Sequence, residues 1–180
     1  MLDREKTALV IVDVQEAFRS AVPDLALVAS RISMAARGFA AVGAPIFVTE
    51  QYPAGLGRTV EEILFSLGED VPFVEKSTFS AWGEASFRSL IEEKGITAVA
   101  LCGIETHICV MQTALDLLAN GIEVHLLRDA VASRFEHDRQ AGIARMLEAG
   151  ARSSSVEMAL FETLKDSRDA AFKAVQSIIK

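Results

Sequence analysis

Three side chains that could act together in covalent catalysis stand at or just after short apolar segments of the chain. Asp13 and Lys76 each follow such a segment directly, and Cys109 comes shortly after a third. A thiol can attack an electrophilic carbon, a carboxylate can accept the thiol proton, and an ammonium group can stabilise the negative charge. Each residue also has an ordinary interpretation, as a turn-capping aspartate, a solvated lysine or a small core cysteine.

The segment 97–121 determines the expected surroundings of Cys109. Its residues 98–101 form an apolar run typical of a strand buried on both faces, and Gly103 breaks this run. Apolar residues then recur every three or four positions, which predicts a helix at 106–119 with Thr106 as its N-cap. Cys109 would lie in the first helical turn, where unpaired N–H groups and the helix dipole favour a thiolate, so we expect a lowered thiol pKa.

The start of the same helix could bind the oxyanion of a tetrahedral intermediate. Backbone N–H groups there are suitable donors, and we assign this role to the N–H groups of Glu105 and Cys109. Cys102 is expected to be inert core. Other side chains that follow strand ends could line an apolar pocket, although aromatic residues at such places often only pack. These weaker candidates are Gln15, Phe18, Tyr52, Phe79, Trp82 and His107, the last of which could instead touch a neighbouring subunit.

The composition favours one domain spanning 1–180. Of its 180 residues, 51% are hydrophobic, which is enough for a full core without disulfides, and the formal net charge is −7. No cluster of Lys and Arg is present, which argues against nucleic acid or an anionic membrane as partner. The two cysteines and the short apolar run after a charged N-terminus lead us to expect a reducing, cytoplasmic setting.

Strand-like and helix-like segments alternate along the chain, and most of the strand-like segments lack polar alternation. This pattern predicts an α/β fold with a parallel sheet covered by helices on both faces. Ligands bind beyond the carboxyl ends of such strands, so Asp13, Lys76 and Cys109 could meet in one crevice. The expected strands are 7–12, 44–49, 71–75, 98–101, 122–127 and 151–156. The expected helices are 23–42, 85–93, 106–119, 138–147 and one that begins at 167. We expect 50–72 to be a loop and partial lid around a short helical piece at 60–67.

Three motifs resemble those of the isochorismatase-like cysteine hydrolases. Asp13 lies in Leu-Val-Ile-Val-Asp-Val-Gln-Glu-Ala-Phe, Lys76 precedes Ser-Thr-Phe-Ser-Ala-Trp, and Cys109 lies in Gly-Ile-Glu-Thr-His-Ile-Cys-Val. The resemblance extends to about residue 162. The segment Thr-Glu-Gln-Tyr-Pro-Ala-Gly-Leu-Gly is similar to the sequences of one subgroup, the isochorismatase-domain-containing hydrolases.

The resemblance implies a three-layer α/β/α, Rossmann-like fold whose six-stranded parallel sheet has the order 3-2-1-4-5-6. It also implies a catalytic triad of Asp13, Lys76 and Cys109, and a cis peptide before the nucleophile helix at Ile104–Glu105. Members of this family are commonly homo-oligomers with the active site near a subunit boundary. Residues Phe172, Val175 and Ile179 predict one apolar helical face, and Leu115 and Leu118 another, either of which could be left over for such an interface.

Departures from other branches of the family narrow the expected chemistry. Isochorismatases proper lack the nucleophilic cysteine, so Cys109 argues against hydrolysis of a vinyl ether. Nicotinamidases carry a metal cluster with histidines after the second strand, but residues 50–58 contain no histidine here. The three histidines, His107, His125 and His137, are not spaced as a zinc set, so we expect no metal and no cofactor.

These observations predict a cysteine-dependent hydrolase of a small amide or related acyl compound, acting through a thioester-type intermediate. One alternative is an isochorismatase-type hydrolase of another small metabolite. The others are a catalytically idle binding module of the same fold and a thiol oxidation sensor. An intact triad argues against the idle module, and the lack of a well-placed second cysteine weakens the sensor.

Overall fold

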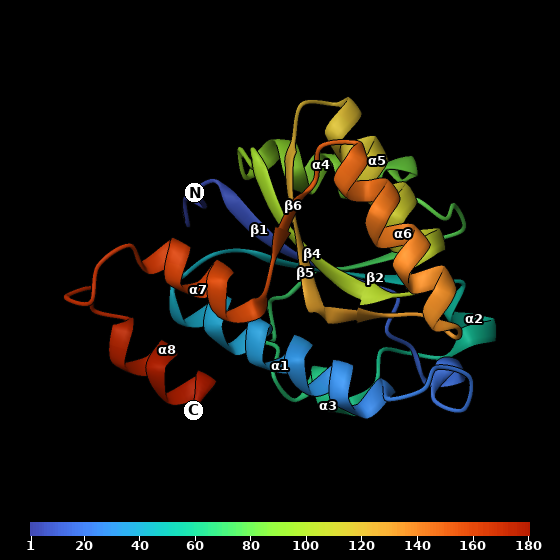
Figure 1. The fold of residues 1–180 in the computed structure, drawn as a ribbon, viewed down its shortest axis with the longest axis horizontal. Coiled ribbons are helices and arrows are strands. Elements are labelled where there is room, and N and C mark those ends of the chain that lie inside the picture. The colour runs from blue at the N-terminus through green and yellow to red at the C-terminus, as the bar shows by residue number, and fades with distance from the viewer.

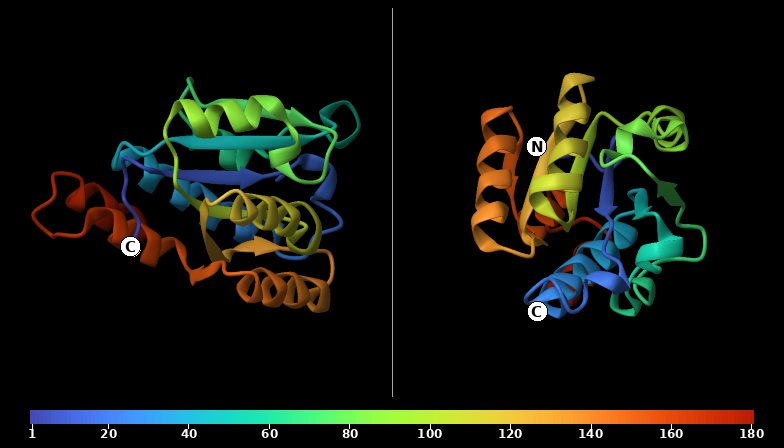
Figure 2. Two further views of the ribbon diagram at one scale, coloured as in Figure 1. Left: turned by 90° about the horizontal axis from the view of Figure 1, so that it is seen from above. Right: turned by 90° about the vertical axis from the view of Figure 1, so that its right-hand side faces the viewer.

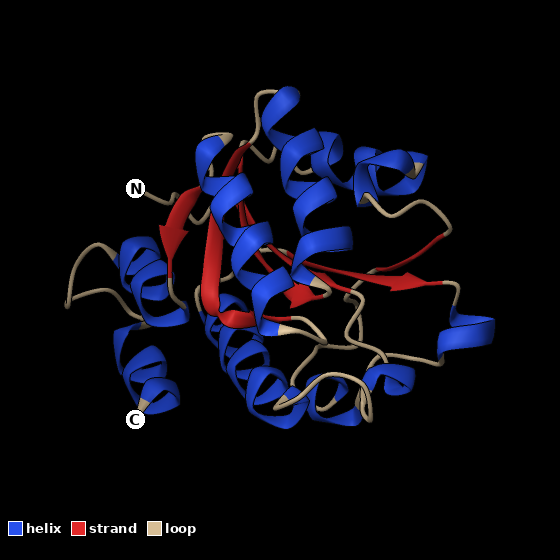
Figure 3. Ribbon diagram, turned by 45° about the vertical axis from the view of Figure 1, so that its right-hand side comes forward, coloured by secondary structure: helices blue, strands red, loops and turns tan.

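A computed structural model describes all residues 1–180, and it contains one six-stranded sheet in which every strand pair is parallel. The strand order is β3-β2-β1-β4-β5-β6, which confirms the expected fold (Figure 1). Parallel neighbours need a crossover connection, and helices supply these connections here (Figure 3). The strands are β1 Thr7–Val12, β2 Ile46–Gln51, β3 Phe73–Lys76, β4 Ala98–Ile104, β5 Glu123–Ala132 and β6 Arg152–Ser154.

Helices cover both faces of the sheet and make the three layers visible in Figure 2. One apolar core lies between the sheet and helices α1, α3, α7 and α8, and a second lies between the sheet and helices α4, α5 and α6. Alternate residues of a strand enter opposite cores, as Leu9 and Val10 do in β1. The helices are α1 Leu25–Ala41, α2 Pro53–Leu56, α3 Glu61–Leu64, α4 Ala85–Glu93, α5 Met111–Ala119, α6 Glu136–Glu148, α7 Val156–Leu164 and α8 Phe172–Ile179.

Strand β4 continues through Gly103 instead of ending before it, which corrects the expected break. Gly103 has φ of +139°, and a Cβ atom built there would lie 2.3 Å from the carbonyl oxygen of Val12. The pairing of β4 with β5 shifts register between Leu101 and Gly103. The glycine therefore permits two adjacent strands to approach closely at the end where the site is formed.

The C-terminal part contains a helix that the sequence did not lead us to expect. Helix α7 begins after Ser155, whose side chain caps it by accepting a hydrogen bond from the Met158 N–H at 3.2 Å. The last helix begins at Phe172, and its Val175 is fully buried against the first core. Phe172 and Ile179 pack against the same core, so this apolar face is covered within the chain. The other candidate face, with Leu115 and Leu118 of α5, is half-buried.

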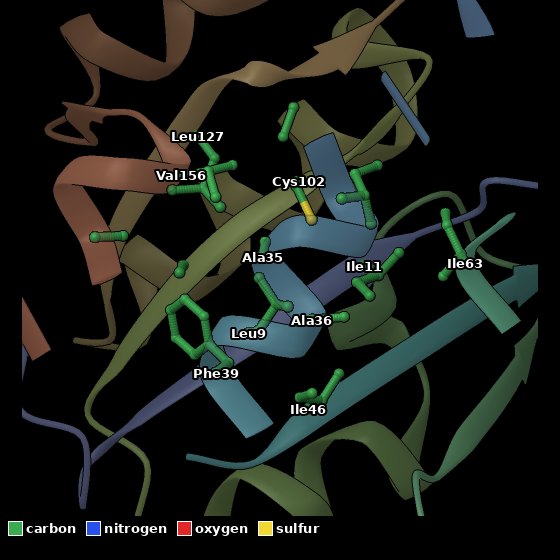
Figure 4. Close-up of a cluster of buried hydrophobic side chains, with 14 of the residues drawn as sticks. Leu9, Ile11, Ala35, Ala36, Phe39, Ile46, Ile63, Cys102, Leu127 and Val156 are labelled. Atoms are coloured by element: carbon green, nitrogen blue, oxygen red, sulfur yellow. The ribbon is translucent and has the colours of Figure 1, made fainter. Parts of the chain in front are cut away.

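The close-up of the first core shows Cys102 among aliphatic side chains of β1, β4 and α1 (Figure 4). Its sulfur is fully buried, and its nearest polar contact is the carbonyl oxygen of Val10 at 3.5 Å. Burial raises the pKa of this thiol far above its usual range. These surroundings agree with the expectation of an inert core cysteine.

Most of the segment 50–72 is irregular, as we expected, but Glu50 and Gln51 end β2. The segment contains two short helices, α2 and α3, where one helical piece at 60–67 was expected. The buried Glu50 anchors it, because its Oε1 accepts hydrogen bonds from the Thr59 N–H and Oγ1, both at 2.8 Å. Across the whole chain, none of the helices combines the length and the apolar character that crossing a bilayer requires.

Candidate active site

Asp13 lies directly after β1 in a left-handed conformation with φ of +55°. Its backbone N–H bonds the carbonyl of Thr49 on β2, and its Oδ1 accepts a hydrogen bond from Thr49 Oγ1 at 2.7 Å. Its Oδ2 is buried and makes one polar contact, an ion pair with Lys76 Nζ at 2.6 Å. One carboxylate oxygen is thus held by a neutral donor and the other by a cation.

Lys76 is the last residue of β3, and its side chain is completely buried. Besides Asp13, its ammonium group donates to Gln51 Oε1 at 2.7 Å and to the carbonyl oxygens of Thr78 at 3.1 Å and Phe79 at 3.0 Å. A buried cation needs such a complete set of acceptors, because an unpaired charge in the interior is very costly. The solvated-lysine interpretation is therefore excluded for Lys76.

The chain turns from β4 into the helix that carries Cys109 at Glu105, which has φ of +56° and stands at the N-cap position. Thr106, which we expected to be the N-cap, instead donates its hydroxyl to the carbonyl of Ala132 at 2.8 Å. The first turn, Thr106–Val110, is a wide π-type turn, and the Met111 N–H reaches back five residues to the carbonyl of Thr106. Cys109 lies inside this turn, and α5 continues the helix from Met111.

The thiol of Cys109 does not have the lowered pKa that we expected from its position near the helix start. Burial raises its pKa to about 12, the negative charge of Asp13 adds to this effect, and the positive charge of Lys76 opposes it without overcoming it. The residue is only 7% exposed, so desolvation of the thiolate outweighs the favourable cation. At neutral pH Cys109 is therefore a thiol, and any reaction through its sulfur would require a base.

The expected cis peptide is also absent, because the Ile104–Glu105 peptide is trans, as is every other peptide bond of the chain. The reversal of direction comes instead from the positive φ values of Gly103 and Glu105. The carboxylate of Glu105 stabilises this turn by bonding Arg134, through the backbone N–H and Nε at 3.1 Å each and through Nη2 at 3.0 Å. We expected a cis bond there to aim the N–H groups of Glu105 and Cys109 at the oxyanion, and with a trans bond that part of the assignment is lost.

A cavity of about 240 Å³ lies over Cys109 at the carboxyl ends of the strands. It is larger than a few water molecules and matches the size of a small ligand. A larger hollow of about 460 Å³ lies at the opposite, amino ends of β2 and β3, and none of the three reactive residues lines it. The smaller cavity is lined by Asp13, Phe18, Gln51, Leu56, Phe79, Ile104, Glu105, Ile108, Cys109 and Arg134.

The sequence matches the isochorismatase domain family over residues 7–158, which is most of the chain and includes all three reactive residues. The chain belongs to the isochorismatase domain family. It is 40% identical over 171 residues to isochorismatase domain-containing protein 1 of Salmo salar, covering 93% of this chain and 59% of the salmon protein. The chain thus spans little more than half the length of that relative. The motif resemblance and the family's hydrolase fold are both confirmed.

Two solved structures extend the comparison. The structure described as the MAR1 ribonuclease of Caenorhabditis elegans superposes with a TM-score of 0.88 at 36% identity, covering 99% of this chain and 91% of that one. The pyrazinamidase of Pyrococcus horikoshii in complex with zinc superposes with a TM-score of 0.75 at 25% identity, covering 83% and 99% respectively. Members of very different stated activity thus share the fold of this chain, so its function must be argued from the site itself.

Among the weaker candidates in this isochorismatase domain, only Phe18 and Phe79 line the cavity. Gln15 is fully buried and bonds backbone atoms of Gln51 and Gly57, while Tyr52 is 64% exposed and precedes α2. Trp82 packs against the second core. His107 points toward α6, with Nδ1 3.2 Å from Ser133 Oγ and Nε2 3.8 Å from Asp138, so it is not positioned to touch a ligand in the cavity.

The sequence interpretation overlooked two polar side chains of the cavity, Gln51 and Arg134. Gln51 ends β2 as Lys76 ends β3, and the two are paired in register. The predicted strand stopped at residue 49, so Gln51 did not stand at a predicted strand end. Arg134 follows β5, which proved to be longer than the apolar run that predicted it. No group of three or more His, Cys, Asp or Glu side chains in the chain is arranged to hold a metal ion.

Proposed function

We propose that this isochorismatase-family chain is a cysteine-dependent hydrolase of a small amide or related acyl compound. The observation that carries the proposal is the contact of Asp13 with Lys76 at 2.6 Å, together with the opening of Asp13 and Cys109 into one cavity. The charges of Asp13 and Lys76 both influence the Cys109 thiol. An acid–base group, a fixed cation and a thiol are the parts that covalent acyl transfer requires.

In the proposed reaction, Asp13 Oδ2 accepts the proton of the Cys109 thiol as Sγ attacks the acyl carbon. This oxygen forms an ion pair with Lys76 but accepts no hydrogen bond, so a lone pair is available for the proton. Collapse of the tetrahedral intermediate breaks the bond to the leaving group, which takes the proton from Asp13, and leaves a thioester on Cys109. Water then attacks the thioester with Asp13 as base, which releases the acid and restores the thiol.

Lys76 acts as a fixed positive charge throughout. Its four oxygen partners hold the ammonium in place, so no reorganisation is needed when negative charge develops on Cys109 and the substrate oxygen. The raised thiol pKa explains why a base is required, since at neutral pH only a small fraction of Cys109 is thiolate. The proton transfer between Cys109 and Asp13 therefore belongs to the chemical step.

The cavity favours a small substrate with an apolar substituent. Its volume is about 240 Å³, and its walls include the side chains of Phe18, Leu56, Phe79, Ile104 and Ile108. The related pyrazinamidase is, by its name, an amide hydrolase. The nematode relative is named a ribonuclease, but a net charge of −7 opposes binding of a polyanion here.

We also propose that the chain forms a homo-oligomer in which a neighbouring copy helps to close the cavity. Phe79 lines the cavity and is 55% exposed, and Phe135, next to the cavity residue Arg134, is 56% exposed. Large exposed aromatic side chains are typical of interfaces rather than of monomer surfaces. Light scattering at micromolar concentration tests this proposal, and a fully active monomer would contradict it.

A substrate panel tests the catalytic proposal directly. Small carboxamides, ureas, carbamoyl compounds and a short RNA would each be incubated with wild type, Cys109→Ala and the control Cys102→Ala. We expect turnover of at least one amide or carbamoyl compound by wild type and Cys102→Ala, and none by Cys109→Ala. Cleavage of RNA alone would contradict the proposed substrate class, and equal activity of Cys109→Ala would contradict the proposed nucleophile. Absence of turnover with reversible oxidation of Cys109 would indicate the thiol-sensor alternative.

A further inference from the structure

The ammonium group of Lys76 has four oxygen partners, and only one of them is charged. Asp13 is the carboxylate, whereas the other three are the side-chain oxygen of Gln51 and the backbone carbonyls of Thr78 and Phe79. Gln51 Oε1 lies 2.7 Å from Nζ, which is the shortest of the three neutral contacts. It is also the only one of the three that a substitution can remove without altering the backbone.

The orientation of the Gln51 amide is fixed by its partners. An ammonium group can only donate, so the atom that faces Lys76 must be the oxygen, and Nε2 then donates to the carbonyl of Ser77 at 2.9 Å. The two residues are paired in register at the ends of β2 and β3. The Gln51 side chain therefore links Lys76 to the loop that carries Phe79 into the cavity wall.

A second glutamine fixes the backbone of Gln51 itself. The fully buried Gln15 accepts a hydrogen bond from the Gln51 N–H at 2.8 Å and donates Nε2 to the Gln51 carbonyl at 3.0 Å. Its Nε2 also lies 2.7 Å from the carbonyl of Gly57. Gln15 holds the backbone of Gln51, and the Gln51 side chain holds the Lys76 ammonium, all through hydrogen bonds of ordinary length. Gln51 therefore has little freedom to turn its side chain away from Lys76.

The uncharged oxygen partners of Lys76 become important when the proton moves from Cys109 to Asp13, a transfer that rests on the proposed function. When Asp13 takes the thiol proton, it loses its charge while Lys76 remains buried and positive. The negative charge that develops on Cys109 and the substrate oxygen then becomes the counter-charge, and neutral oxygens must hold the ammonium during the exchange. We propose that Gln51 is the positioning residue that holds the Lys76 ammonium beside Asp13 and Cys109 through this exchange.

Gln51→Met and Gln51→Glu separate this role from simple packing, with Gln140→Met as a matched control. Gln140 lies on the exposed surface of α6, where it bonds only Glu136. Methionine keeps the length of the side chain but removes the acceptor, and we expect kcat for an amide found in the panel to fall about ten- to hundred-fold with KM nearly unchanged. The control should match wild type in both constants and in thermal stability.

Glutamate keeps the acceptor but adds a negative charge next to Lys76. The charged groups around Cys109 are Asp13 and Lys76, with Glu105 and Arg134 also lining the cavity. A further carboxylate weakens the effect of Lys76 on the thiol, so we expect Cys109 in Gln51→Glu to react with iodoacetamide about tenfold more slowly than wild type at pH 8. A structural role alone would not slow alkylation, because loosening the site would expose the thiol.

The alkylation measurement needs no substrate, so it tests Gln51 even if no amide is turned over and the proposed function fails. If Gln51→Met unfolds, the near-isosteric Gln51→Glu still gives both measurements. Slower alkylation of Cys109 in Gln51→Met, which removes the acceptor without adding a charge, together with slower alkylation in Gln51→Glu and an unchanged Gln140→Met, supports the positioning role. A Gln51→Glu protein that alkylates as fast as wild type at every pH between 7 and 10 would overturn it, as would a kcat within twofold of wild type in both Gln51 variants.

Discussion

Replacing Asp13 by Asn should make Cys109 more reactive toward a simple alkylating agent and at the same time inactivate the enzyme. Asparagine tolerates the left-handed conformation of this position, with its φ of +55°, and can still accept the hydrogen bond from Thr49. The substitution removes the negative charge that, after burial, contributes most to raising the pKa of Cys109. The ammonium of Lys76 remains and keeps three neutral oxygen partners.

The size of the effect follows from the charges around the thiol. A like charge close to an ionisable group shifts its pKa by about 1–3 units, and burial of Cys109 is unchanged by the substitution. We therefore expect the pKa of Cys109 to fall from about 12 by one to two units, and not to its usual value. Below the pKa, each unit gives tenfold more thiolate, so alkylation at pH 8 should be about 10–100 times faster. Loss of the general base should lower turnover by about 10²–10⁴.

Iodoacetamide labelling followed by peptide mass spectrometry measures the alkylation rate at each cysteine separately. The fully buried Cys102 serves as the internal control for unfolding. In wild type, the labelling rate of Cys109 should rise about tenfold per pH unit between pH 7 and 10, because this range lies below its pKa. An Asp13→Asn protein whose Cys109 reacts no faster than that of wild type would refute the reasoning, as would full retention of turnover.

Three further predictions concern stability and metal dependence. Gly103→Ala should lower the free energy of unfolding by about 3 kcal/mol or more, because the new Cβ would clash with the Val12 carbonyl and the residue has a positive φ. Gly68 has open space around it, so Gly68→Ala should lower the same free energy by less than about 1 kcal/mol. Urea denaturation measures both. Arg134→Met should destabilise the fold by about 1–3 kcal/mol, since it leaves the buried Glu105 carboxylate without its cation; unchanged stability would mean that this ion pair contributes nothing. Chelator treatment should leave turnover unchanged, and loss of activity that zinc or manganese restores would reveal ligands not recognised here.

The layers and the approximate positions of the strands could be predicted because they depend on local patterns, although β2, β4 and β5 end later than predicted. The strand 7–12 and the helix 85–93 were predicted with the bounds that the structure has, since an apolar run and a glycine after a helical pattern are strong signals. In a parallel sheet all carboxyl ends face the same edge, so Asp13, Lys76 and Cys109 could be placed together without knowing the tertiary structure.

The features that were missed or wrongly predicted depend on three-dimensional surroundings. The pKa of Cys109 is governed by burial and by a carboxylate that is distant in sequence, whereas the helix start was its only local signal. In the sequence Gly103 has the pattern of a strand end, but in the folded chain it lies within β4 and permits close contact with β1. Gln51 became recognisable only through the register that pairs it with Lys76.

The central claim is that Cys109 becomes acylated during turnover. Intact-protein mass spectrometry after rapid acid quenching, with an amide identified in the substrate panel, tests it most directly. We predict an added mass equal to the acyl group, located on the peptide that contains Cys109, lost as the substrate is consumed, and absent from Cys109→Ala. Turnover by wild type with no acyl adduct on Cys109 at any quench time, together with comparable turnover by Cys109→Ala, would contradict the account.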